Sequence, residues 1–284
     1  DAALTAILDG ARLCSHGMRR VIGHATINCL LRRPLLSIFS KVYDFINKEY
    51  LTPVHVWPSV LEELRVLRGL LVYAYADLRM QTSGRITMSD ASLTGYGVTE
   101  ANVDPSAAAQ VCGFSERWRF RDRVSHPDHR VRALEQFEKE MTEFGQADPF
   151  TDPLPVTSST EVIRRELEED FGFPNVPGAM LERSIWKGLY AAPLRYKEAV
   201  HLCEARGVLA AVKHRSRDVQ YHEKELLFLG DNLGLCLALE KGRCSSRPLL
   251  RLLRRIAAEL LASGIRGVFR WVPSELNRAD HLSR

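Results

Sequence analysis

The stretch that decides the fold is LLFLGDNLGLCLALEKGR, residues 226–243. It begins as an apolar run, breaks at a Gly-Asp-Asn turn and resumes at once as a helix-like apolar run. The pattern predicts a buried strand at 224–230 followed by a helix at 232–240. Asp231 would then lie at the carboxyl end of a strand, where α/β sheets bind ligands. Helix capping by Asp231 or Asn232 explains the same residues without any chemistry.

The segments around this stretch predict an α/β domain. Alternating polar and apolar residues at 84–100 predict a β-hairpin, and a further strand is expected at 111–120. Towards the C-terminus, strands and helices are expected to follow each other. The elements expected there are a strand at 185–191, a helix at 195–214, a helix at 247–263 and a strand at 266–272.

Residues 1–80 have a different texture and are predicted to be helical. Apolar residues recur at helical spacing in LLSIFSKVYDFINKEY (35–50) and in SVLEELRVLRGLL (59–71). Neither run holds an obvious group of reactive side chains. We therefore expect a helical module that packs against or spaces other domains.

Composition indicates a globular protein with a sizeable core. Of its 284 residues, 45% are hydrophobic and 26% are charged. The six cysteines form no C-x-x-C pair, which favours buried thiols in a reducing compartment. No stretch resembles a signal peptide or is long enough to span a bilayer. We expect an intracellular location, in the cytoplasm or the nucleus, and no membrane partner.

Positive charge gathers at the C-terminal end of the chain. The net charge is only +4, yet residues 241–284 hold ten lysines and arginines against three acids. In the predicted helix at 247–263, apolar residues form one stripe and arginines occupy another side. The pattern predicts an anionic partner, although a solvated helix face is an equal alternative. The candidate phosphate-binding residues are Lys241, Arg243, Arg251, Arg254 and Arg255.

Three further acids are candidates to share a site with Asp231. Asp90 lies on the apolar face of the first predicted strand, Glu204 interrupts the apolar stripe of the helix at 195–214, and Asp280 begins a last helix. Taken singly, Asp90 and Asp280 are also explained as turn or capping residues. Together the acids predict one site, because two divalent ions about 4 Å apart need clustered carboxylates for phosphodiester cleavage. Mg²⁺ prefers such oxygen ligands.

Four segments resemble the successive motifs of the ribonuclease H domain in retroelement polyproteins. They are SDASLTGYGV (89–98), CEARGVLAAVKH (203–214), LGDNLGLCLALEKGR (229–243) and WVPSELNRADHLSR (271–284). The resemblance is strongest to gypsy-like and DIRS-like elements, whose closing motif is W-V-P-x-x-x-N-x-A-D-x-x-S-R. It implies a ribonuclease H-like α/β fold, a mixed five-stranded sheet flanked by helices. It maps the family's catalytic, metal-binding acids to Asp90, Glu204, Asp231 and Asp280, with two Mg²⁺ ions or Mn²⁺ as the alternative.

The resemblance also implies a domain organisation. LLRRPLLSIFSKVYDFI (30–46) and VWPSVLEELRVLRGLL (56–71) resemble the thumb and connecting region that follows the palm of a reverse transcriptase. Residues 1–80 are thus expected to be a thumb/connection-like segment and residues 81–284 a ribonuclease H-like domain. No Tyr-x-Asp-Asp motif occurs, so this chain is not expected to polymerise DNA. The resemblance implies a palm domain upstream in the same polyprotein.

The interval between Asp90 and Glu204 is longer than the family usually needs, which predicts an insertion at about 121–185. Within it, helices are expected at 131–144 and through 161–171.

The function implied by the resemblance is metal-dependent endonucleolytic cleavage of the RNA strand in RNA–DNA hybrids. The alternative is a catalytically inactive ribonuclease H-like relic or hybrid-binding module, because any helix that holds Asp280 ends with the chain at Arg284. A 3′–5′ exonuclease is disfavoured, since such enzymes usually carry Asp-x-Glu on the first strand, where this chain has Asp90-Ala91-Ser92.

Overall fold

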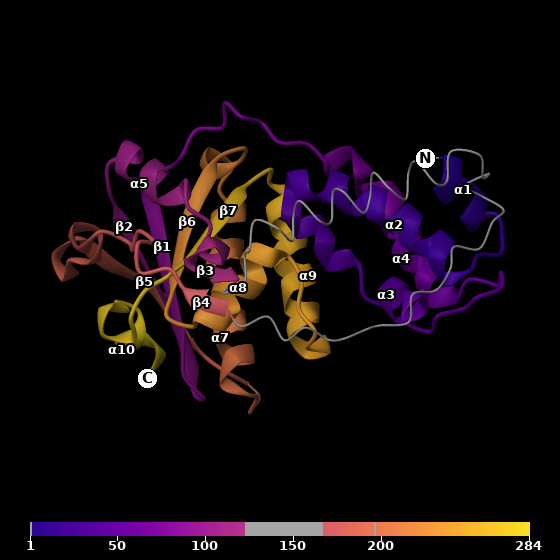
Figure 1. The fold of residues 1–284 in the computed structure, drawn as a ribbon. Coiled ribbons are helices and arrows are strands. Elements are labelled where there is room, and N and C mark those ends of the chain that lie inside the picture. Colours follow the sequence, from indigo (N-terminus) through magenta and orange to yellow (C-terminus); the bar gives the residue numbers. More distant parts are fainter. Residues whose placement is uncertain (1, 123–166, 196) are drawn as a thin grey trace. The chain divides into compact units, whose positions relative to one another are not determined.

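The structure is a computed structural model that describes residues 2–122, 167–195 and 197–284. The chain divides into two compact units, one of residues 1–117 with 174–284 and one of residues 118–173. Helices and strands are labelled as in Figure 1.

The larger unit is built on a five-stranded mixed sheet in the order β5-β2-β1-β6-β7 (Figure 1). The strands are β1 (Arg85–Ala91), β2 (Gly95–Asn102), β5 (Trp186–Pro193), β6 (Glu225–Gly230) and β7 (Arg266–Trp271). β1 pairs with β2, and β2 with β5, in antiparallel fashion; β1 with β6, and β6 with β7, are parallel. This mixed five-stranded sheet, flanked by helices, confirms the predicted ribonuclease H-like α/β fold class.

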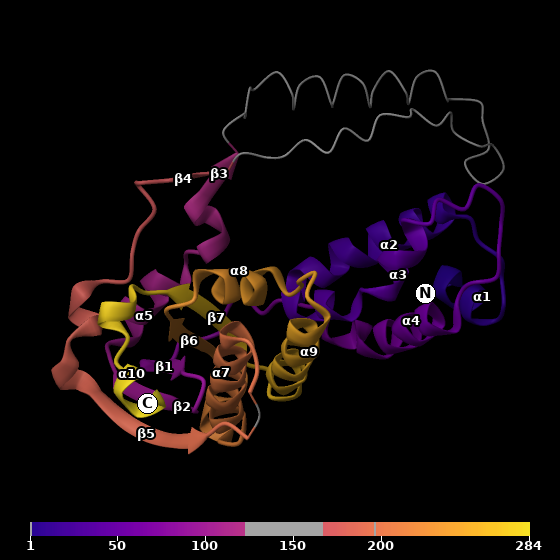
Figure 2. The same ribbon diagram turned by 90° about the horizontal axis from the view of Figure 1, so that it is seen from below.

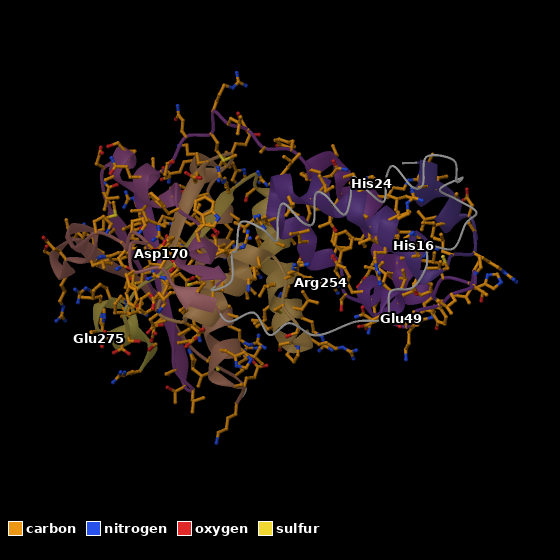
Figure 3. All side chains as sticks on the ribbon, in the orientation of Figure 1. His16, His24, Glu49, Asp170, Arg254 and Glu275 are labelled. Atoms are coloured by element: carbon orange, nitrogen blue, oxygen red, sulfur yellow. The ribbon has the colours of Figure 1, made fainter. Side chains whose placement is uncertain are left out.

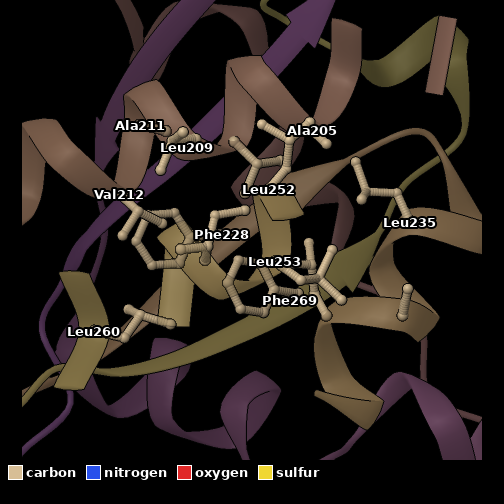
Figure 4. Packing of buried hydrophobic residues seen from close by; sticks show 14 of the residues in the cluster. Ala205, Leu209, Ala211, Val212, Phe228, Leu235, Leu252, Leu253, Leu260 and Phe269 are labelled. Carbon is tan, nitrogen blue, oxygen red and sulfur yellow. The ribbon is translucent and has the colours of Figure 1, made fainter. Parts of the chain in front are cut away.

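Three helices pack on one face of the sheet, and Figure 2 shows two of them, α7 and α9, side by side. The three are α7 (Val200–Ser216), α8 (Leu233–Lys241) and α9 (Arg247–Ala262). Their apolar residues meet those of the strands in one buried cluster (Figure 4). At its centre the rings of Phe228 and Phe269, from neighbouring strands, stack with centroids 5.3 Å apart. The apolar stripe predicted for 247–263 therefore faces this core.

The opposite face carries a second buried cluster. There α5 (Pro105–Cys112) packs against Ile86 and Met88 of β1 and Leu227 and Leu229 of β6. Because β6 is buried on both faces, its residues form a continuous apolar run instead of an alternating one. The short 3-10 helices η4 (Gly178–Leu181) and η5 (Arg183–Ile185) lead from this side into β5.

Residues 2–73 form the predicted helical module. Its elements are α1 (Ala2–Leu8), α2 (Ser15–Cys29), η1 (Leu30–Ile38), α3 (Lys41–Ile46), α4 (Pro58–Leu70) and η2 (Leu71–Tyr73). They share an apolar cluster that includes the fully buried Met18, Val42, Phe45 and Leu64. Leu261 of α9 belongs to the same cluster. The domain boundary near residue 80 stays a prediction.

The strand predicted at 111–120 is wrong at residues 111–119: residues 105–112 form α5, and Glu116–Arg119 form the 3-10 helix η3. The reason lies upstream of the quoted segment. The Asp104 side chain accepts hydrogen bonds from the backbone N–H groups of Ser106 (3.1 Å) and Ala107 (3.2 Å), which caps a helix that Pro105 begins.

The smaller unit contains an antiparallel pair, β3 (Phe120–Asp122) and β4 (Leu167–Glu169). The helix predicted through 161–171 is therefore wrong at residues 167–169, and the helix predicted at 131–144 lies outside the described residues. In the part of the predicted insertion that is described, no residue contributes a strand to the five-stranded sheet.

All six cysteines are free thiols, and four of them are buried. Among the residues placed by the structure, no helix combines the length and the apolar content required to cross a bilayer.

Candidate functional site

The strand register brings Asp90 and Asp231 to the same edge of the sheet. β1 and β6 are parallel neighbours, and Met88 lies opposite Leu229. Asp90 follows Met88 by two positions within β1, and Asp231 follows Leu229 by two positions, directly after the end of β6 at Gly230. Both carboxylates are therefore at the carboxyl ends of adjacent parallel strands, the edge at which α/β sheets bind ligands.

The capping explanation of the Gly-Asp-Asn turn applies to Asn232 alone. Its side-chain Oδ1 accepts a 2.9 Å hydrogen bond from Leu235 N and caps α8. Asp231 uses its backbone instead, since its carbonyl oxygen accepts a 2.9 Å hydrogen bond from Trp271 Nε1. The Asp231 carboxylate is thus not required as the helix cap.

Glu204 reaches this edge because α7 lies close to β1. A Cβ added at Gly207 would lie only 3.3 Å from the backbone oxygen of Asp90, so glycine permits the approach one turn after Glu204. Glu204 lines a small pocket together with Ser89, Asp231 and Asn232.

The Glu204 carboxylate is held in an unfavourable setting. Its Oε2 is buried without a hydrogen-bond partner among the described residues. Burial, followed by repulsion from Asp231 and Asp90, raises the pKa of Glu204 to about 7, against a lowering contribution from the Asn232 side chain. A buried, unsatisfied carboxylate between two other acids is the chemistry that a bound cation would relieve.

Asp90 is buried, with 8% of its surface exposed, but both of its oxygens have partners. Asn277 Nδ2 donates to Oδ1 at 3.1 Å, and Ser283 Oγ donates to Oδ2. Burial raises the pKa of Asp90, the Ser283 hydrogen bond lowers it, and repulsion from Asp231 and Asp280 raises it further.

Asp280 begins the short helix α10 (Asp280–Ser283), and its side chain is partly exposed. Its Oδ1 accepts a 2.8 Å hydrogen bond from Arg284 Nη2, and both side chains of this pair are substantially exposed. Asp280 is nevertheless close enough to raise the pKa of Asp90. Mutual repulsion therefore links the four predicted acids: Asp90, Glu204, Asp231 and Asp280.

Proximity does not amount to a preformed metal site. Within the described ranges, no group of three or more His, Cys, Asp or Glu side chains is placed so that it could hold a metal ion. Both oxygens of Asp90 and Oδ1 of Asp280 accept hydrogen bonds from protein groups. Glu204 Oε2 is a buried oxygen without a hydrogen-bond partner among the described residues, and a cation would satisfy it.

The predicted basic residues are of two kinds. Lys241, Arg243, Arg251 and Arg255 are exposed. Arg254 instead extends from α9 to the helical module (Figure 3), where it donates to Ser37 O at 2.8 Å, to Ile38 O at 2.6 Å and to Glu63 Oε1 at 3.0 Å. The helical periodicity predicted that the arginines point away from the core, but not that Arg254 contacts the helical module.

Several residues of the site were not singled out from the sequence. Trp271, Asn277 and Ser283 hold Asp231 or Asp90, and all three occupy specified positions of the quoted closing motif. Their positions in the motif could have singled them out, but the sequence does not show which residues they contact.

Comparisons with known proteins add little to this geometry. No protein-family model matches the chain, and no curated protein matches it. Among solved structures, a foamy viral protease-reverse transcriptase in complex with RNA/DNA hybrid is similar, with 11% identity and a TM-score of 0.27. The match covers 99% of this chain and 49% of that one, so the chain spans about half that protein's length. The fold assignment accordingly rests on the strand order and register described above.

Proposed function

We propose that the protein is a metal-dependent endonuclease that cleaves the RNA strand of RNA–DNA hybrids as part of a retroelement reverse transcriptase. The observation that carries this proposal is the register of β1 and β6, which aligns Asp90 and Asp231 at one sheet edge. Glu204 and Asp280 add charge at the same place. The four motifs quoted from the sequence support the hybrid as substrate.

The four acids, Asp90, Glu204, Asp231 and Asp280, would hold the metal. When bound, Mg²⁺, or Mn²⁺ in its place, supplies an activated water and stabilises the leaving oxygen of a phosphodiester. Glu204 offers a buried oxygen that no described protein group satisfies. Asp280 forms an exposed ion pair with Arg284, and such pairs contribute only about 0–1 kcal/mol to stability. Little free energy is therefore needed to turn the Asp280 carboxylate from Arg284 towards a metal ion.

The exposed cations would hold the substrate. Lys241, Arg243, Arg251 and Arg255 extend into solvent, where they can neutralise backbone phosphates. Such contacts orient a nucleic acid without reading its sequence. They suit a nuclease that selects a hybrid by its shape and by its 2′-hydroxyl groups.

A hybrid-binding module without catalysis is the second candidate, and one observation favours it. The described acids include no set of three arranged to hold a metal, and both oxygens of Asp90 are bonded to neutral donors. A protein of this kind would bind the hybrid through its exposed basic residues, and its acids would take no part in catalysis.

Cleavage of end-labelled substrates separates the two candidates. The wild-type protein is incubated with an RNA–DNA hybrid, duplex DNA or single-stranded RNA, in Mg²⁺ or in EDTA. Asp231→Asn keeps the shape of the side chain and removes its charge, and Asp9→Asn, an exposed acid of the helical module, is the matched control.

We expect the wild type and Asp9→Asn to cut only the RNA strand of the hybrid, only with Mg²⁺. Asp231→Asn should bind the hybrid, keep its fold and lose cleavage. Its melting temperature without metal should rise, since Asp231 repels Asp90 and Glu204. Tight hybrid binding by a wild type that never cleaves would establish the second candidate. Near-normal cleavage by Asp231→Asn would remove Asp231 from the site.

A further inference from the structure

We propose that Asn277 and Ser283 are positioning residues that orient the Asp90 carboxylate for metal binding. This inference rests on the proposed function and assigns the closing segment, residues 271–284, a task beyond carrying Asp280. Asn277 Nδ2 donates to Asp90 Oδ1 at 3.1 Å, while Ser283 Oγ donates to Asp90 Oδ2. One donor on each oxygen fixes both the rotation and the tilt of the carboxylate.

Both positioning residues are themselves held in place. Asn277 is 5% exposed, and its Oδ1 accepts a 3.0 Å hydrogen bond from Ala279 N. Ser283 is 2% exposed, and its backbone oxygen accepts a 2.5 Å hydrogen bond from Ser92 Oγ. Buried polar groups with a complete set of partners specify one arrangement, whereas exposed ones exchange with water.

The sheet provides a packing surface for this segment. α10 packs on β1, β2 and β5, as both ribbon views show (Figures 1 and 2). Gly97 lies opposite Asp90 in the β1–β2 register. A Cβ at Gly97 would overlap Leu282 Cβ and lie 3.0 Å from Ala279 O, so the glycine admits the backbone of α10. The segment is therefore docked directly above the carboxylate that it contacts.

Anchors independent of Asp90 keep the segment in place when one donor is removed. Arg278 N donates to Met88 Sδ, and the Arg278 guanidinium donates to Leu181 O at 2.6 and 2.8 Å. Loss of the Ser283 hydroxyl should thus free one oxygen of Asp90 without releasing α10. Replacing a group that orients a metal ligand typically costs about 10- to 100-fold in metal affinity.

The test is Mg²⁺ binding and Mg²⁺-dependent cleavage by Ser283→Ala and Asn277→Ala. Ser263→Ala is the matched control, since Ser263 is a buried serine whose Oγ donates to Glu259 O at 2.7 Å, with no acid of the site as partner. Binding is measured without nucleic acid, by calorimetric titration and by the rise of the melting temperature with Mg²⁺.

We expect Ser283→Ala to weaken Mg²⁺ binding about 10-fold or more and to raise the half-saturating Mg²⁺ concentration for cleavage by the same factor. The rate at saturating Mg²⁺ should stay close to wild type, because excess metal restores the occupied site. Ser263→Ala should match the wild type in both measurements. Asn277→Ala should behave like Ser283→Ala. If Asn277→Ala does not fold, the result for Ser283→Ala decides the test.

Unchanged or tighter Mg²⁺ binding by Ser283→Ala would overturn the inference, the tighter result meaning that Ser283 competes with the metal for Asp90. A wild type that neither binds Mg²⁺ nor cleaves the hybrid overturns the proposed function, and the positioning role with it. The two failures are distinct, since the first appears only in the variants and the second already in the wild type.

Discussion

Trp271 Nε1 donates a 2.9 Å hydrogen bond to the backbone oxygen of Asp231, joining the end of β7 to the turn that follows β6. Next to it, Val272 N donates to Gly230 O at 3.0 Å. The indole thus holds the backbone that presents the Asp231 carboxylate. This hydrogen bond gives a reason for a tryptophan at position 271 of the closing motif, in addition to the apolar area that a tryptophan buries.

Replacement of Trp271 by Phe tests this contact. The ring is kept and the donor removed, so we expect a loss of roughly 1 kcal/mol in the free energy of unfolding. Cleavage should fall further than in Trp186→Phe, which loses an equivalent 2.9 Å hydrogen bond to Met180 O. Denaturant unfolding and hybrid cleavage measure the two effects. Equal cleavage by both variants would show that the Asp231 backbone does not need the indole.

The Glu204 pKa of about 7 predicts a pH dependence of stability in the metal-free protein. Because the folded pKa is raised from 4.5, the folded state holds the proton more tightly than the unfolded state. This stabilisation is complete below about pH 4.5 and is lost as the pH rises through about 7. Glu204→Gln removes the dependence.

The variant should therefore match the wild type near pH 4.5 and exceed its free energy of unfolding by on the order of 2 kcal/mol at about pH 8. Urea unfolding in EDTA at both pH values measures this, with the exposed Glu62→Gln as control. A wild type that gains stability relative to Glu204→Gln as the pH rises would contradict the predicted sign.

The buried Glu116–Arg270 pair should be essential for folding of the larger unit. Arg270 Nε donates to Glu116 Oε2 at 2.7 Å, and the side chains of Arg270 and Glu116 are 1% and 0% exposed. Arg270 also donates to Val111 O at 2.8 Å and to Pro174 O at 2.6 Å. Breaking such a pair leaves a buried charge without its counter-ion.

We expect Arg270→Met to lower the free energy of unfolding by about 3–5 kcal/mol. Arg79→Gln, which removes an arginine that is 94% exposed, should change it by under about 0.5 kcal/mol. Thermal and denaturant unfolding measure both variants. If the two destabilisations were similar, the buried pair would not hold this part of the fold together.

The arginines of α9 should separate into those that bind substrate and one that holds the fold. The double variant Arg251→Gln/Arg255→Gln should weaken hybrid binding and flatten its salt dependence by about one unit of slope for each phosphate that is no longer neutralised. Arg254→Gln should instead cost about 1–3 kcal/mol of stability, because it removes the donor to Glu63 Oε1 and to the backbone oxygens of Ser37 and Ile38. Hybrid binding at several salt concentrations and urea unfolding test both. Unchanged affinity and slope in the double variant would identify a solvated face.

Much of the architecture was readable from local patterns. The apolar run before Asp231 and the helix after it appear as β6 and α8, and the alternation at 84–100 appears as the β1–β2 hairpin. Side-chain periodicity predicts such elements because it follows from backbone geometry within a few residues. The sequence alone also predicted that Asp90, Glu204, Asp231 and Asp280 lie on separate elements and share one site.

Only the tertiary structure decided which groups meet. Asn277 and Ser283 contact Asp90, although they are 187 and 193 residues away from it in the sequence. Arg254 of α9 likewise donates to Ser37 O of the helical module. Periodicity carries no information about such pairs, because a hydrogen bond between distant segments depends on how sheet and helices pack. The sequence determined which side chains point away from the apolar face of each helix or strand. Packing determined which of these side chains contact another segment and which remain in solvent.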